Sequence, residues 1–360
     1  MMENEQITLP QLTFLWVWGI VATGILYFPT TISRHVVEDA WTVAVPFFLA
    51  FGAMIAWLHG VLGTKFSRMT LIGICETICG KIIGKFLGLI LVLWFLFVTA
   101  LTLRLVGEFV VLTIMPETPL IAIVLLFMVL VAYSVRHGIE VIARTGEILS
   151  PVSYVAIAVV VVLVAKEARF ENLLPFMAQG WGPPIRAALT PVSFAATTLG
   201  ALMFTPSLNR PRLLKLSLVL SVVVVSTAGL MIESMSTMVF GAARREIMFL
   251  HFDLIRLIKL LNIHLGLQSI FMTVIICGSF LQVSLFYHLT VVGLRQWLGL
   301  MYYRPLVTPL GVVIIALSVL LFENILEIVD FMDKFLPAAS LTLQVGIPCL
   351  LLLGARVRRL

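Results

Sequence analysis

The sequence predicts an all-α integral membrane protein, on the evidence of its composition, its repeated apolar stretches and two interruptions within them. Hydrophobic residues make up 61% of the 360 residues and charged residues only 12%, which lies outside the usual range of soluble globular domains. Apolar stretches of about twenty residues, each long enough to cross a roughly 30 Å hydrocarbon core as a helix, recur from end to end. We therefore expect a single transmembrane domain over residues 1–360.

Hydropathy places ten transmembrane helices along the chain. They are expected at residues 11–33, 42–64, 86–115, 119–134, 147–165, 187–208, 213–240, 267–293, 305–322 and 335–354. An even number of spans puts both termini on the same side of the membrane.

The charges of the loops indicate which side that is. With the N-terminus in the cytoplasm, fourteen Lys and Arg residues fall at the inner side and nine at the outer side, as the positive-inside rule requires. We expect both termini to be cytoplasmic. The formal net charge of +6 then suits the topology and an anionic inner leaflet, and it gives no reason to expect a nucleic-acid partner.

The stretch GILYFP at residues 24–29 places Gly24 and Pro29 inside the first predicted span. Both residue types interrupt helices, and lipid tolerates irregular backbone only where it is buried in protein or lines a cavity. One interpretation is a proline kink repaired by neighbouring helices. The other is a break that belongs to a binding site.

The stretch GALMFTP at residues 200–206 repeats this pattern, with one extra residue before the proline. Each stretch lies in the first span of a five-helix set, and interrupted helices at corresponding positions of two halves point to a transporter-type binding site. Because each half has an odd number of helices, the halves, at approximately 1–165 and 187–354, are inverted relative to each other. The prediction is a LeuT-like 5+5 inverted repeat with broken first and sixth helices.

Such breaks present main-chain N–H and C=O groups near the bilayer centre, where helix ends favour the carboxylate and the ammonium of a small zwitterion. The predicted site residues are Thr23, Gly24, Ile25 and Leu26 at the first break, with Phe194, Thr197, Thr198 and Gly200 on the sixth span. Phe194 is expected as an apolar wall. The two threonine hydroxyls either face the site or bond back to their own helix.

Three ionisable residues fall within predicted spans, where charge is costly and is a functional hypothesis by default. Arg104 and Glu108 are four residues apart on one helical face, so they form either a neutralising structural pair or a substrate clamp. Glu233 has no such local partner. It either couples transport to a proton or lies near the outer interface.

Two connecting segments have recognisable patterns. The segment FLHFDLIRLIKLLNIHL at residues 249–265 repeats apolar residues at helical spacing, which predicts an amphipathic helix that lies at the interface or docks a partner. The segment at residues 168–189 contains many Gly and Pro residues and predicts a short gate or re-entrant loop beside the sixth span.

Metal and enzyme chemistry find no support in the sequence. Cys75 and Cys79 are four residues apart, but two further ligands at metal-site spacing are missing. Nucleotide-binding loops, metalloprotease helices and nucleophile elbows are absent from the sequence. We expect no metal, no cofactor and no catalytic activity.

Seven short motifs carry a family resemblance through their order and spacing. They are AW at 40–41, GKIIGK at 80–85, LRLVGEF at 103–109, MPETP at 115–119, VRHGIEVIARTGEILSP at 135–151, ENLLPFMAQG at 171–180 and YRPLVTPLG at 303–311. In this order they resemble the spore germination permeases, the membrane-embedded B subunits of bacterial nutrient germinant receptors. The resemblance covers nearly the whole chain.

The resemblance implies a member of the amino acid, polyamine and organocation superfamily in the inner membrane of an endospore, with an A subunit and a lipoprotein C subunit as partners. The superfamily's substrate site maps onto Gly24, Ile25, Thr197 and Thr198, with Glu108 and Ser279 as weaker placements on the third and eighth helices. Many relatives carry a carboxylate near the sixth-helix break and an acidic and arginine pair entering the eighth helix. This chain has two threonines and NIHLGLQS at 262–269 instead, which leaves the germinant open.

Three functions fit these observations. In the first, a nutrient such as an amino acid binds at the broken helices and biases a conformational equilibrium that partner subunits read. In the second, the protein transports an amino acid, with a proton passing through Glu233 or Glu108. In the third, it is a structural or ion-conducting subunit. We rank them in this order, although a sensor descended from a transporter keeps the same fold.

Overall fold

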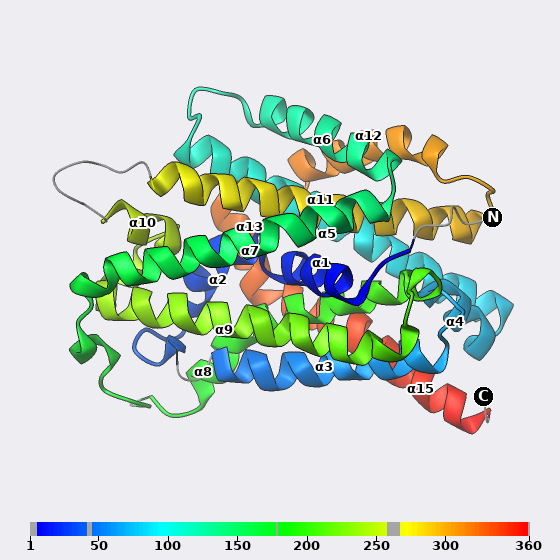
Figure 1. Ribbon diagram of the computed structural model, residues 1–360, viewed down its shortest axis with the longest axis horizontal. Helices are drawn as coiled ribbons and strands as arrows, with labels where there is room; N and C mark the ends of the chain where they lie inside the picture. Colours follow the sequence, from blue (N-terminus) through cyan, green and yellow to red (C-terminus); the bar gives the residue numbers. More distant parts are fainter. Residues whose placement is uncertain (1–5, 42–44, 178, 258–266, 359–360) are drawn as a thin grey trace.

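The computed structural model describes residues 6–41, 45–177, 179–257 and 267–358. Within these residues the chain forms a bundle of long helices (Figure 1), and extended pairing is limited to an isolated parallel bridge between Ile7 and Leu208. The two ends of the chain lie at the same end of the bundle, which we call the termini end (Figure 1).

The helices follow the predicted spans closely. The predicted first half contains α1 (Leu9–Val21), α2 (Gly24–Ser33), α3 (Val45–Lys65), α4 (Leu71–Cys79), α5 (Lys81–Thr113), α6 (Leu120–Arg136) and α7 (Ile139–Val164). Two short 3-10 helices follow, η2 (Ala165–Glu167) and η3 (Phe170–Leu173). The predicted second half contains α8 (Gly182–Ala195), η4 (Ala196–Met203), η5 (Thr205–Ser207), η6 (Pro211–Leu213), α9 (Leu214–Phe240), η7 (Gly241–Arg245), α10 (Leu250–Arg256), α11 (Leu267–Leu298), α12 (Arg304–Leu320), α13 (Ile325–Lys334), α14 (Leu336–Leu341), the π-helix η8 (Thr342–Gly346) and α15 (Ile347–Val357).

The all-α membrane architecture is confirmed. In the described part of the chain, seven helices are long and apolar enough to cross a membrane, and up to nine spans result if each bent helix pair counts as one. Helix α6 is apolar but has only 17 residues, so the count of ten stays a prediction. Helix α7 starts at Ile139 rather than at 147, because its charged first turns are helical although they are not apolar.

Both predicted interruptions change the helix geometry, but in different ways. Helices α1 and α2 meet at an angle of 44°, so the first span is broken. The sixth span continues from α8 into the eight-residue 3-10 helix η4, in which hydrogen bonds reach three residues back instead of four. The main chain is therefore irregular in both spans.

Helix α1 lies at the centre of the bundle. It contacts α7, α9 and α11, and the side chains from Leu15 to Ile20 are all buried. A helix that is apolar on every side is expected to be enclosed by protein. The first break therefore lies in the interior, where neighbouring helices can reach it.

Arg104 holds the sharp corner between α12 and α13. Its guanidinium pairs with Glu108 at 2.8 Å and donates to the carbonyls of Ser318, Val319 and Glu323 at 3.0–3.3 Å. These carbonyls lie where α12 ends and turns by 96° into α13, and the last carbonyls of a helix need such partners. Of the two interpretations of this pair, the arrangement matches the structural one.

The described part of the amphipathic segment packs against the bundle. Helix α10 covers Leu250–Arg256 of the predicted 249–265, and residues 258–265 lie outside the described residues. Its apolar side chains are buried, and it contacts α2, α9 and α11. The segment thus brings His251 into the interior beside the first break.

Candidate functional site

A glutamine side chain is inserted into the first break. In a continuous helix the N–H of Thr23 would donate to the carbonyl of Gly19. Instead, Gln282 of α11 accepts from Thr23 N at 3.0 Å and donates to Gly19 O at 3.0 Å. Gln282 is fully buried. A side chain that replaces one helical hydrogen bond by two is a known cause of a kink, and it satisfies both backbone groups.

Pro29 opens a second backbone group in the same span. Proline has no N–H, so the carbonyl of Ile25, four residues earlier, lacks its helical donor. His251 of α10 supplies one, with Nδ1 at 2.8 Å from Ile25 O. Because a carbonyl only accepts hydrogen bonds, Nδ1 carries the proton.

Glu233 lies in a buried charge cluster, whose members come from outside the helical neighbourhood in which the sequence shows no partner. Its carboxylate pairs with Arg244 at 2.7 Å and faces His251 Nε2 at 3.3 Å. Arg244 is itself fully buried and also donates to Ser33 and Thr237. The two partners follow Glu233 by 11 and 18 residues, beyond the reach of helical spacing rules.

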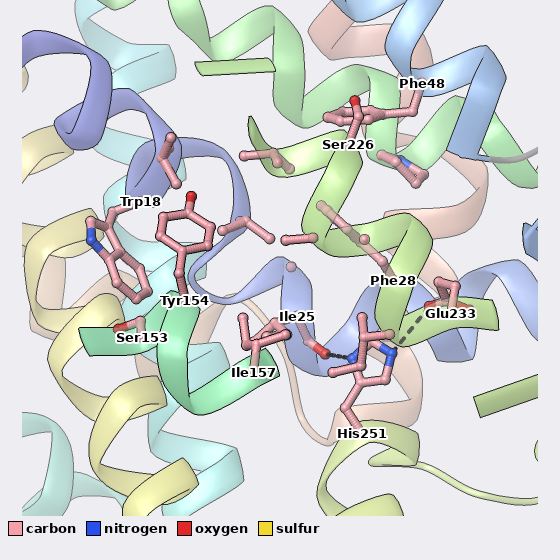
Figure 2. Close-up of a pocket in the computed structure, with 18 of the residues that line it drawn as sticks. Trp18, Ile25, Phe28, Phe48, Ser153, Tyr154, Ile157, Ser226, Glu233 and His251 are labelled. Atoms are coloured by element: carbon pink, nitrogen blue, oxygen red, sulfur yellow. Dashed lines mark hydrogen bonds and ion pairs between the residues drawn. The ribbon is translucent and has the colours of Figure 1, made fainter. Parts of the chain in front are cut away.

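A cavity of about 90 Å³ lies beside the first break, between α1, α2, α7, α9, α10 and α11, with Phe48 of α3 and Pro191 of α8 completing its wall. Figure 2 shows Trp18 and Tyr154 on one side of it and Glu233 with His251 on the other. The remaining wall is mostly apolar and includes Ile25. The cavity thus combines a hydrophobic wall with one buried carboxylate.

The second break belongs to a separate polar network. Thr197 and Thr198 donate to the carbonyls three residues back, at 2.6 Å and 2.8 Å, which is the alternative in which the hydroxyls serve their own helix. His59 of α3 lies 2.9 Å from the Thr198 hydroxyl and 2.6 Å from the carbonyl of Gln344 in the π-helix η8. With its amide oriented to satisfy both atoms, Gln344 also bonds Ala196 O and Trp94 Nε1.

The model of one protein family, described as spore germination protein, matches residues 6–325. The chain belongs to this family. Spore germination protein KB of Bacillus subtilis (strain 168) is 26% identical over 336 residues, which cover 91% of this chain and 88% of that protein. Spore germination protein YndE of the same organism is 23% identical over 192 residues, 52% of each chain. The resemblance inferred from the sequence motifs is confirmed.

Solved structures of transporters share the fold of this spore germination protein. MhsT in complex with L-phenylalanine has a TM-score of 0.73 and 16% identity, over 95% of this chain and 89% of MhsT. The nucleobase-cation-symport-1 family transporter Mhp1, in a closed conformation with bromovinylhydantoin bound, has a TM-score of 0.69 and 15% identity, over 96% of this chain and 78% of Mhp1. The predicted LeuT-like fold is confirmed.

Few of the residues predicted for the site of this spore germination protein line the cavity. Gly24, Ile25 and Glu233 line it. The others predicted lie outside its lining, namely Thr23, Leu26, Arg104, Glu108, Phe194, Thr197, Thr198, Gly200 and Ser279. The break at 22–23 turns its backbone towards Gln282, and the 3-10 geometry turns the threonine hydroxyls to their own helix, so these groups are already bonded.

Several of these outlying residues have packing roles. Phe194 supports the cavity wall from behind, with its ring 4.9 Å from that of Phe28, which does line the cavity. A Cβ on Gly200 would come within 2.6 Å of Leu289 and 2.8 Å of Trp16, so this glycine permits close packing. The buried hydroxyls of Thr23 and Ser279 have no hydrogen-bond partner among the described residues.

Sequence reasoning missed the polar residues that the fold brings to the breaks. They are His59, Arg244, His251 and Gln282. Two signals could have found part of this set. His59 and Gln282 are polar residues inside apolar spans, where side-chain hydrogen bonds join helices, and Pro29 marks Ile25 as a carbonyl that needs another donor.

Gly278 allows the indole of Trp18 to approach α11. A Cβ at position 278 would lie 2.2 Å from the ring, so Gly278→Val must displace an indole that donates to Ser150 at 2.9 Å. We expect a loss of about 1–3 kcal/mol in stability, the usual cost of overpacking, and a shift of tryptophan fluorescence. Gly229→Ala is the matched control, because nothing lies within 4 Å of its Cβ position. Equal stability of the two variants would contradict the tight contact.

Proposed function

We propose that this protein is the membrane-embedded subunit of a nutrient germinant receptor and that its nutrient, a small amino acid, binds in the cavity beside the first break. The observation that carries the proposal is the pairing of a hydrophobic cavity with the buried carboxylate of Glu233. A carboxylate in such surroundings attracts an ammonium group, because charge interactions strengthen where water is excluded.

The cavity also sets a size for the ligand. Its volume of about 90 Å³ is smaller than the roughly 150 Å³ that holds a benzene molecule in a protein interior. A short aliphatic side chain fits this space and an indole does not. The ammonium of the ligand would meet Glu233, while the hydroxyl of Tyr154, which makes no hydrogen bond to another described residue, offers a further polar contact.

The cluster around Glu233 connects such a ligand to the first span. Glu233 contacts His251, which donates to the Ile25 carbonyl, and Arg244, which donates to Ser33 at the end of α2. A ligand that redistributes the hydrogen bonds of Glu233 would change the relative stability of two arrangements of α2. Differential affinity for two states is sufficient for a sensor, and no catalytic step is needed.

The family supports the remaining assignments. Its relative in Bacillus subtilis is named spore germination protein KB. We propose that the protein lies in the endospore inner membrane with both termini in the cytoplasm. We also propose A and C subunits as its partners. A working amino acid transporter is the second candidate, favoured by the fold shared with MhsT and Mhp1.

Filling the cavity tests the proposed site. Gly229 shares one face of α9 with Ser226 and Glu233, which line the cavity, and nothing lies within 4 Å of its Cβ position. The Cβ of a leucine at 229 therefore meets no other atom, and Gly229 itself lines the cavity, so we expect the rest of the side chain to occupy it. We expect a small aliphatic amino acid, at a hundredfold excess over its dissociation constant, to stabilise the purified protein by roughly 2.7 kcal/mol. This stabilisation should disappear in Gly229→Leu.

The control variant is Thr227→Leu, which adds bulk on an exposed face of the same helix. It should keep the stabilisation. A panel of amino acids without effect on the parent protein, or an undiminished effect in Gly229→Leu, would rule out this cavity as the site. Uptake of the stabilising amino acid into proteoliposomes would identify a transporter, and binding without uptake a sensor.

A further inference from the structure

A second, larger cavity lies at the termini end of the bundle. Its volume is about 330 Å³, within the range of small-molecule sites. It is bounded by the end of α11, the start of α12, the start of α4 and the segment that follows η4. None of its lining residues is shared with the cavity beside the first break.

This cavity is positively charged. Its charge comes from Arg295, which lines it together with Arg304, and the lining contains no aspartate or glutamate among the residues that the structure describes. Arg295 makes no ion pair with another described residue, and its Nε is buried without a hydrogen-bond partner. A buried guanidinium nitrogen without a partner costs free energy, so the site is incomplete without an acceptor.

His288 adds a second unpartnered group. The residue is only 3% exposed, and its ring is 5.9 Å from that of Phe204 and 5.4 Å from that of Tyr303. Its Nδ1 is buried and has no partner among the described residues. The ring also hydrogen-bonds the backbone carbonyl of Val135, which places the proton on Nε2, so Nδ1 at the cavity wall can accept a hydrogen bond from a hydroxyl group of a ligand.

The N-terminus of α12 also favours an anion in this cavity. Tyr303, Arg304 and Pro305 line the cavity, and they form the cap and the first positions of α12. The N-terminus of a 17-residue helix carries a partial positive charge and favours anions. The hydroxyl of Ser207 lies in the same wall.

We propose that this cavity binds a phosphate-type oxyanion, with Arg295 as its ion-pair partner, Ser207 as a hydrogen-bond donor and His288 as the acceptor for a hydroxyl group of the ligand. Guanidinium groups bind phosphate oxygens through charge-assisted, often bidentate hydrogen bonds. Two sources supply this chemistry, the headgroup of an anionic lipid and a soluble phosphate. Met301 and Tyr302, at 70% and 68% exposure, lie on the rim, where an acyl chain can lie against them.

Thermal unfolding of the detergent-purified full chain tests the site and separates the two sources. One series uses inorganic phosphate against sodium chloride of equal ionic strength. The other uses micelles with phosphatidylglycerol against micelles with phosphatidylcholine. We expect stabilisation by at least one of the phosphate-bearing probes. Stabilisation by phosphate alone identifies a soluble anion, and stabilisation by phosphatidylglycerol alone identifies a lipid headgroup.

Substitutions assign the effect to the cavity. Arg295→Gln should raise the apparent dissociation constant about tenfold or more, as expected for the loss of a hydrogen bond to a charged group. Arg356→Gln removes the same charge from an exposed position at the same end and should leave the constant unchanged. Ser207→Asp places a negative charge in the wall and should abolish binding, which keeps the test decisive if Arg295→Gln fails to fold. The absence of any phosphate-dependent stabilisation, or binding that survives Arg295→Gln and Ser207→Asp, would overturn the proposal.

The outcome is independent of the proposed nutrient site. The amino acid panel and Gly229→Leu address the cavity beside the first break, whereas these probes and variants address the termini end. Either site can fail while the other is confirmed.

Discussion

Glu233→Ala is expected to destabilise the protein by roughly 3–5 kcal/mol, the usual cost of leaving one partner of a buried ion pair without the other. Arg244 is fully buried, and after the substitution its remaining hydrogen-bond partners among the described residues are neutral groups such as Ser33 and Thr237. Unfolding in detergent, followed by circular dichroism, measures the loss. The same variant should lose amino acid binding, because Glu233 lines the cavity.

The double variant Glu233→Met with Arg244→Met is the control for this prediction. Replacing a buried ion pair by apolar side chains of similar volume is often neutral or stabilising. The double variant should therefore regain most of the lost stability while still failing to bind the amino acid. If both variants are equally unstable, the unpaired charge is not the cause of the loss.

Gln282→Leu is expected to have the second largest effect. It removes the partners of Thr23 N and Gly19 O at the first break, and an unsatisfied buried group costs about 1–3 kcal/mol. The two groups can avoid this cost by bonding each other directly, which would straighten the 44° bend between α1 and α2. We expect either a loss of stability or a straighter first span, measured by thermal unfolding and by the distance between spin labels on the two helices.

Gln268→Leu is the matched control for this substitution. Gln268 lies near the start of the same helix, is partly exposed and makes no side-chain hydrogen bond to another described residue. Its replacement should change neither the stability nor the bend. A Gln282→Leu variant with parental stability and an unchanged bend would show that the glutamine does not hold the break.

The fold could be predicted because the membrane imposes a strong local constraint. Each span needs about twenty apolar residues, and this length is visible in the sequence without knowledge of any tertiary contact. Gly24 and Pro29 likewise predict an interruption through their own backbone chemistry. The positions of the helices and of the first break follow from such local signals.

The side chains that distant segments bring to the two breaks could not be predicted in the same way. Helical spacing rules search only three or four residues away from Glu233, whereas Arg244 and His251 lie in the next connection and reach it through the fold. The hydroxyls of Thr197 and Thr198 can each serve either a ligand or their own helix, and the 3-10 geometry of η4 selects the second. These choices depend on packing between distant segments.

The glutamine in the first break has a consequence for how the protein is made. Gln282 follows Thr23 by 259 residues, and a ribosome that adds about 5–20 residues per second needs roughly 13–52 s for that distance. During this interval the first span is already available for membrane insertion without the side chain that bends it. A continuous helix then satisfies its own backbone. Translation order therefore favours entry of the first span as a straight helix that acquires its bend late, when α11 has been synthesised and docks.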